Sequence, residues 1–258
     1  MSDPPTTENY PEVTVEEVTV PTREGELPAL VFSPPPAGRR PAVVLAAEAF
    51  GINDFTRQVA ATLAHLGYVT VVPDYYRGAG PEHPESYDDF TEVIEHIGRL
   101  DFRRAALDVV AAVEQAEGLD AVDPRRVAVW GYCTGGTLAL LAAELRPELA
   151  AAVLFFPSQP TFAELDDRHP VHPIDLLWSI GCPVLVMYGD EDPVMPAERL
   201  ADLERRLAAW HVDADVRTYP GAGHAFSAPA PPLHHEAADR ASWADALEFL
   251  ARHLGSPV

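Results

Sequence analysis

The sequence contains no lysine, only two cysteines, and no apolar run long enough to span a membrane. All 18 basic residues are therefore arginine, and 40 acidic residues oppose them, which gives a formal net charge of −22. Such a charge repels nucleic acid and anionic membranes, so neither is expected as a partner. Two cysteines also do not make a disulfide framework.

The first eleven residues are polar and lack the basic and apolar regions of a signal peptide. We expect residues 1–11 to be a disordered lead-in and the protein to be cytoplasmic. The remaining 12–258 suit one large domain, because 47% of the chain is hydrophobic and no linker divides it. The acidic, lysine-free composition fits either adaptation to high salt or a coding bias.

Short apolar runs alternate with helical patterns along most of the chain, which predicts an α/β fold. The architecture expected is a mostly parallel, doubly wound sheet of about eight strands with helices on both faces. A two-stranded hairpin at 13–20 and 27–32 should form one edge of this sheet. The polar segment 75–100 is expected to be a cap-like insertion over the carboxyl ends of the strands. The other expected strands are 42–47, 68–72, 127–130, 151–156, 183–188 and 214–219, and the expected helices are 54–66, 102–117, 197–210, 240–253 and one starting near 134.

One motif joins an expected strand to an expected helix, with Cys133 between Gly131 and Gly135. This is the spacing of a nucleophile elbow, in which a tight strand-to-helix turn raises the nucleophile clear of the backbone. The turn requires neighbours without a Cβ atom, and the two glycines supply them. The positive end of the following helix favours the thiolate form of Cys133. A buried cysteine beside a glycine-rich turn is the structural alternative.

Two later strands end in residues that could activate such a nucleophile. Asp190 and Asp192 follow the strand 183–188, and His224 follows the strand 214–219. The chain order nucleophile, acid, histidine is that of α/β-hydrolases. We expect His224 to hold or remove the thiol proton and Asp192 to orient the imidazole, whereas Asp190 should hydrogen-bond its own turn. Glu48 ends a buried strand, so its carboxylate should also have an assigned partner.

Taken together, these motifs resemble those of the dienelactone hydrolase family over nearly the whole chain. The matching stretches are 48–53 (EAFGIN), 131–136 (GYCTGG), 189–196 (GDEDPVMP) and 221–226 (GAGHAF). The resemblance implies an α/β-hydrolase fold with a catalytic triad of Cys133, Asp192 and His224. It also implies that Glu48 interacts with the resting thiol, and that the backbone amides of Ala49 and Thr134 form the oxyanion hole.

The chain departs from the family pattern where an arginine would help to bind a substrate carboxylate. Ala228 occupies that position, four residues after His224. A second family arginine is matched by Arg77, displaced by one residue. Arg77 and Tyr132 are the expected substrate-binding residues, and dienelactone itself is a doubtful substrate.

No cofactor or metal is expected. The histidines at 169 and 172 and at 234 and 235 lack suitable ligand partners, and Cys182 is expected to be a packed residue. The sequence thus predicts a cysteine hydrolase that opens lactones or cleaves small esters, as a monomer or weak homodimer. A broad carboxylesterase or thioesterase is the alternative enzyme, and a non-catalytic ligand-binding protein on the same scaffold is the alternative from another class.

Overall fold

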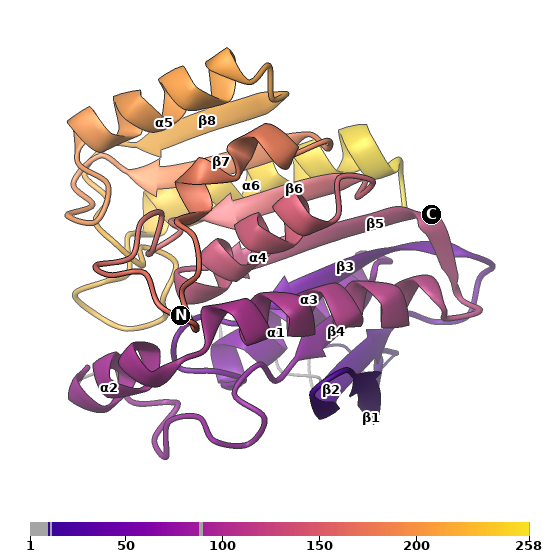
Figure 1. Ribbon diagram of the computed structural model, residues 1–258. Coiled ribbons are helices and arrows are strands. Elements are labelled where there is room, and N and C mark those ends of the chain that lie inside the picture. The colour runs from indigo at the N-terminus through magenta and orange to yellow at the C-terminus, as the bar shows by residue number, and fades with distance from the viewer. Residues whose placement is uncertain (1–9, 11, 88–89, 258) are drawn as a thin grey trace.

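The computed structural model describes residues 10, 12–87 and 90–257, which form an eight-stranded sheet flanked by helices (Figure 1). The strand order is β1-β2-β4-β3-β5-β6-β7-β8. β1 pairs with β2 and β2 pairs with β4 in antiparallel fashion, and every other pair is parallel. The strands are β1 Thr14–Thr22, β2 Gly25–Ser33, β3 Arg40–Ala46, β4 Val69–Pro73, β5 Val122–Tyr132, β6 Ala151–Phe155, β7 Val184–Gly189 and β8 Ala214–Tyr219.

Among the described residues there are six α-helices, of which five cover the two faces of the sheet and one, Thr91–Arg99, lies away from it (Figure 1). They are α1 Asp54–His65, α2 Thr91–Arg99, α3 Phe102–Glu117, α4 Thr134–Leu145, α5 Ala197–Ala209 and α6 Glu236–Leu254, and two short 3₁₀ turns occupy Pro173–Asp175 and Leu177–Ser179. Figure 1 shows α3, α4 and α5 in front of the sheet and α6 behind it. The rings of α1 and α6 reach the same face of β5, since Phe55 contacts Tyr132 and Trp243 contacts Trp130.

The central strands are apolar along their whole length because both of their faces are covered. All residues of β4, β6 and β7 are buried. This continuous pattern is typical of parallel strands, and it differs from the exposed β1, where only Val20 is buried. The fold therefore leaves polar side chains to the loops, and those at the carboxyl ends of the parallel strands share one edge.

The predicted fold class and the hairpin at the sheet edge are confirmed, with element boundaries within a few residues of those expected. One element was not anticipated: α2 lies inside the polar segment 75–100. The predicted disorder of residues 1–11 falls on positions that, apart from Tyr10, lie outside the described residues.

Candidate active site

The turn between β5 and α4 presents Cys133 in a strained conformation. Its φ is +51°, which is unfavourable for a residue with a Cβ atom. The flanking glycines allow the turn to close: a Cβ on Gly131 would lie 2.0 Å from the carbonyl oxygen of Gly135, and a Cβ on Gly135 would lie 2.2 Å from that of Ala46. No other residue type fits either position, so the motif fixes the place of the sulfur.

Three side chains from three strand ends meet in a continuous hydrogen-bonded chain. Nε2 of His224 lies 3.2 Å from Sγ of Cys133, and Nδ1 of the same ring lies 2.8 Å from Oδ2 of Asp192. The Asp192 side chain is fully buried, and its Oδ1 accepts a hydrogen bond from the Val194 amide at 2.8 Å. The imidazole is thus held at both nitrogens, with a carboxylate on one side and a thiol on the other.

The electrostatics of this chain favour a thiolate facing an imidazolium. Burial alone would raise the pKa of the Cys133 thiol, but the charge of His224 and hydrogen bonds from His224 and Ser158 lower that pKa overall. Burial would likewise lower the pKa of His224, yet Cys133 and Asp192 raise it to about 10. Each partner stabilises the charged form of the other, which is the condition for an activated cysteine.

Two backbone amides beside the sulfur are free to bind an anion. Thr134 is the first residue of α4, where amides have no partner within the helix. Ala49 follows Glu48 in the loop after β3 and is 4% exposed. Within the described residues, neither amide donates to a protein acceptor. The expected oxyanion hole would use these two amides.

Glu48 is buried near this group and forms no ion pair with any of the described residues. Its Oε1 accepts hydrogen bonds from the Asn53 side-chain amide, at 3.2 Å, and from the Tyr87 hydroxyl. Burial raises the pKa of Glu48 despite these bonds. The sulfur of Cys133 is hydrogen-bonded to His224, and in this arrangement Glu48 bonds to Tyr87 and Asn53.

Comparison with known proteins agrees with this geometry. The model of the dienelactone hydrolase family matches residues 27–254. The chain belongs to that family.

Named relatives span nearly its whole length. A Salmonella typhimurium protein named "Putative carboxymethylenebutenolidase" is 31% identical over 92% of this chain and 87% of its own length. A Bradyrhizobium protein named "Probable 2-oxo-3-(5-oxofuran-2-ylidene)propanoate lactonase" is 31% identical over 88% of this chain and 89% of its own. A dienelactone hydrolase structure from Klebsiella pneumoniae superposes with a TM-score of 0.84 at 27% identity, covering 93% of this chain and 99% of that one. The protein is accordingly a carboxylic ester hydrolase of the dienelactone hydrolase type.

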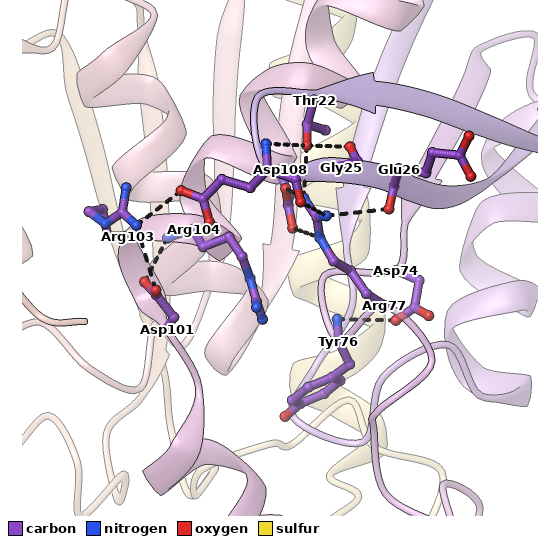
Figure 2. A network of polar contacts seen from close by, with 11 residues as sticks. Thr22, Gly25, Glu26, Asp74, Tyr76, Arg77, Asp101, Arg103, Arg104 and Asp108 are labelled. Atoms are coloured by element: carbon purple, nitrogen blue, oxygen red, sulfur yellow. Dashed lines mark hydrogen bonds and ion pairs between the residues drawn. The ribbon is translucent and has the colours of Figure 1, made fainter. Parts of the chain in front are cut away.

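Arg77 departs from the role that the family resemblance implied. All five of its N–H donors are used within the protein (Figure 2). Two go to the carboxylate of Asp108, at 3.0 and 2.6 Å, and the others to the carbonyls of Glu24 and Glu26 and to the hydroxyl of Thr22. The expectation that Arg77 binds substrate is therefore corrected: it clamps the β1–β2 hairpin to α3.

Tyr132 also differs from its expected role. It is 3% exposed, and its ring packs against Phe55, Trp130 and Phe155. The expectation that Tyr132 contacts substrate is corrected, because alternation along β5 directs its side chain into the core under α1 and α6. Ala228, where the family arginine would stand, is 1% exposed.

Asp190 makes a different hydrogen bond from the one expected. Its Oδ1 accepts from the amide of Gly221, at 2.7 Å, rather than from its own turn. The exposed Asp190 thus braces the loop that carries His224. The carboxylate that contacts the imidazole is that of Asp192.

Sequence reasoning missed Tyr87, which hydrogen-bonds to Glu48, and Ser158, whose amide donates to the carbonyl of Cys133. Tyr87 lies in the inserted segment, where no pattern distinguishes it from its polar neighbours. Ser158 follows the end of β6, so the rule that gathers residues at strand ends could have found it. Tyr75 and Tyr76 bind this segment to the loop after β3 through hydroxyl bonds to the carbonyls of Glu48, at 2.6 Å, and Ala49, at 2.8 Å.

The described part of the chain shows neither a membrane-spanning helix nor a metal-binding group of side chains. None of its helices combines the length and apolarity of a membrane span. Its His, Cys, Asp and Glu side chains form no group of three or more arranged to hold a metal ion.

Proposed function

We propose that this protein hydrolyses small lactones or esters through an acyl-enzyme on Cys133. The observation that carries the proposal is the unbroken contact from Sγ of Cys133 through His224 to Asp192, at 3.2 and 2.8 Å. Every reacting group required for acyl transfer lies in one place, and the charged states are mutually stabilised. The names of its relatives, carboxymethylenebutenolidase and lactonase, support the same reaction class.

In the first half of the reaction, the thiolate of Cys133 attacks the carbonyl carbon of the substrate. The carbonyl oxygen becomes an oxyanion, which the amides of Ala49 and Thr134 stabilise. When the tetrahedral intermediate collapses, the carbon–oxygen bond of the ester breaks. The leaving oxygen takes the proton from Nε2 of His224, and a thioester remains on the sulfur.

In the second half, neutral His224 takes a proton from water as that water attacks the thioester carbon. The carbon–sulfur bond then breaks, which releases the acid and restores the thiolate. Asp192 keeps Nδ1 of His224 protonated throughout, so that Nε2 is always the nitrogen that exchanges protons. Glu48 is held by hydrogen bonds from Tyr87 and Asn53; its charge opposes the thiolate, and burial raises its pKa.

The charges around the site favour neutral substrates. Ala228 provides no guanidinium. All the N–H donors of Arg77 bind to Asp108 or to the β1–β2 hairpin. A substrate carboxylate would find Glu48 instead of a bidentate cation. We therefore propose neutral lactones or small neutral esters over anionic dienelactones.

The alternative functions make different demands on the site. A thioesterase or broad carboxylesterase would use the same three residues and differ only in substrate. A ligand-binding protein without turnover would not need an imidazole held at both nitrogens. We also propose a cytoplasmic location, where a reactive free thiol stays reduced, and a monomer or weak homodimer.

Replacement of the nucleophile tests the proposed reaction. Cys133→Ala should lower kcat/KM for a chromogenic ester by about a thousandfold or more. Cys182→Ala is the matched control, because Cys182 is buried and unlinked to the triad, and it should retain activity. A rapid burst of product that iodoacetamide abolishes should accompany native turnover. Full activity in Cys133→Ala would refute the mechanism.

A further inference from the structure

Two tyrosines that follow β4 hold the loop after β3 by its carbonyl groups. The hydroxyl of Tyr75 donates to the carbonyl of Glu48 at 2.6 Å, and the hydroxyl of Tyr76 donates to the carbonyl of Ala49 at 2.8 Å. The backbone of the tyrosine pair is fixed in turn, because the carboxylate of Asp74 accepts from the Tyr76 amide at 3.1 Å (Figure 2). Both tyrosines are buried, so their hydroxyls have defined positions against the loop.

The carbonyl of Glu48 belongs to the same peptide unit as the amide of Ala49. Among the described residues only the Pro231–Pro232 bond is cis, so this unit is trans and its N–H points away from its C=O. The carbonyl accepts two hydrogen bonds, one from the Tyr75 hydroxyl and one from the amide of Gly51 at 2.9 Å. These bonds fix the direction of the oxygen, and they therefore also fix the direction of the N–H at the other end of the unit.

The Ala49 amide is buried and donates to no acceptor among the described residues. It is one of the two donors expected at the oxyanion hole. The loop lies against the turn of the nucleophile, since a Cβ on Gly135 would lie 2.2 Å from the carbonyl oxygen of Ala47. A buried N–H without a partner costs free energy, and an oxyanion bound there would recover that cost.

We propose that Tyr75 is a positioning residue that directs the Ala49 amide at the oxyanion by holding the carbonyl of Glu48. The inference rests on the proposed acyl transfer at Cys133, because only that reaction forms an oxyanion beside this amide. Burial raises the pKa of Tyr75 well above its usual range, so the hydroxyl keeps its proton and remains a donor. A hydrogen bond to the C=O also polarises the peptide unit, which makes its N–H a stronger donor to a negative oxygen.

The turnover number of Tyr75→Phe tests this role, because the change removes the hydroxyl and keeps the ring. We expect kcat for a neutral chromogenic ester to fall by about five- to tenfold, the factor that one neutral hydrogen bond supplies, with KM nearly unchanged. Both halves of the reaction form an oxyanion, so the loss appears whichever half limits kcat. The amplitude of the burst counts the active sites, and kcat is thereby expressed per folded enzyme.

Alkylation of the nucleophile separates the oxyanion hole from the rest of the site. In a Cys182→Ala background Cys133 is the single thiol, and iodoacetamide reacts with its thiolate. The sulfur displaces iodide from a saturated carbon, so no oxyanion forms. Tyr75→Phe should therefore leave the alkylation rate at every pH unchanged, whereas a general loosening of the site would change both reactions.

Tyr76→Phe is the matched control, because it removes a similar bond to the same loop. The carbonyl that Tyr76 holds belongs to the next peptide unit, whose N–H is that of Phe50. Tyr76→Phe should therefore keep the native kcat. An unchanged kcat in Tyr75→Phe, equal losses in the two variants, or a loss matched by slower alkylation would each overturn the inference. Failure of the proposed function would be seen separately, as ester turnover that survives Cys133→Ala.

Discussion

The two ends of helix α4 carry two buried acids whose pKa values move in opposite directions. At the N-terminal end, burial would raise the pKa of Cys133, but its partners lower it. Near the C-terminal end, burial raises the pKa of Glu144 to about 9, and both of its carboxyl oxygens lack a hydrogen-bond partner in the described residues. Burial by itself would raise both pKa values, so burial alone does not explain the difference.

The difference comes from the groups that meet each acid. Cys133 lies where the ends of β5, β7 and β8 converge, with the imidazole of His224 facing it and the positive end of the helix behind it. Glu144 lies among apolar groups, and the helix dipole at that end opposes a negative charge. A buried ionisable group therefore becomes reactive where the fold supplies a partner, and stays neutral where it does not.

The largest effect should come from replacing Asp192, the carboxylate that acts on Cys133 through the imidazole of His224. Asp192→Asn should lower kcat by about a hundredfold to ten-thousandfold, because an amide facing Nδ1 favours the wrong tautomer of His224. Asp190→Asn is the matched control: its Oδ1 can still accept from Gly221, so activity should change little. Steady-state kinetics of both variants decide the point. Equal losses, or a larger loss in Asp190→Asn, would place the triad acid at Asp190.

The unpaired carboxyl of Glu144 should make the free energy of unfolding depend on pH. Because the folded pKa of Glu144, about 9, lies above its ordinary value of 4.5, the folded protein keeps a proton that the unfolded chain releases. The free energy of unfolding is therefore unaffected by Glu144 below pH 4.5 and falls as the pH rises from there toward 9. At pH 7 the cost is about 3 kcal/mol, so Glu144→Gln should stabilise the protein by up to about that amount.

Denaturant unfolding of this variant and the native protein at several pH values measures the difference. The gain should be near zero at pH 4 and grow toward pH 8. Glu198→Gln, at an exposed site on α5, is the control and should show no such trend. A pH-independent gain in Glu144→Gln would mean that the carboxyl is ionised in the folded state.

The fold could be predicted well because its signals are local. β3, β4, β6 and β7 are short, mostly apolar runs, and the glycines at 131 and 135 mark a turn that only they can make. Placing Cys133 and His224 at one edge then followed from parallel strands, whose carboxyl ends lie together. Strand position did not distinguish Asp192 from Asp190, because both residues follow β7.

Side-chain partners from distant parts of the chain could not be predicted in the same way. Arg77 pairs with Asp108, 31 residues away, and nothing in the sequence marks that aspartate as buried. The bond from Tyr87 to Glu48 joins positions 39 residues apart, across a segment without periodic pattern. In α2 only Val93 is buried, and it packs with Ala49 and Phe50 of the loop after β3, about forty positions earlier in the chain.

The smallest expected effect is the preference of the site for a neutral over an anionic substrate. It applies the contrast between paired and unpaired groups to the substrate. Because the donors of Arg77 are all used and Ala228 provides no guanidinium, a carboxylate on the substrate gains no bidentate bond from either position. A neutral ester should then have a kcat/KM about tenfold above that of its carboxylated counterpart, the factor that one missing charge-assisted bond supplies. Arg77→Met should leave this ratio unchanged and instead lower the free energy of unfolding by about 3 kcal/mol, because it strands the buried carboxylate of Asp108. Kinetics on the matched pair and denaturant unfolding separate the two effects. A native preference for the anion that Arg77→Met abolishes would show that this guanidinium reaches the substrate, and that its pairing with Asp108 gives way during turnover.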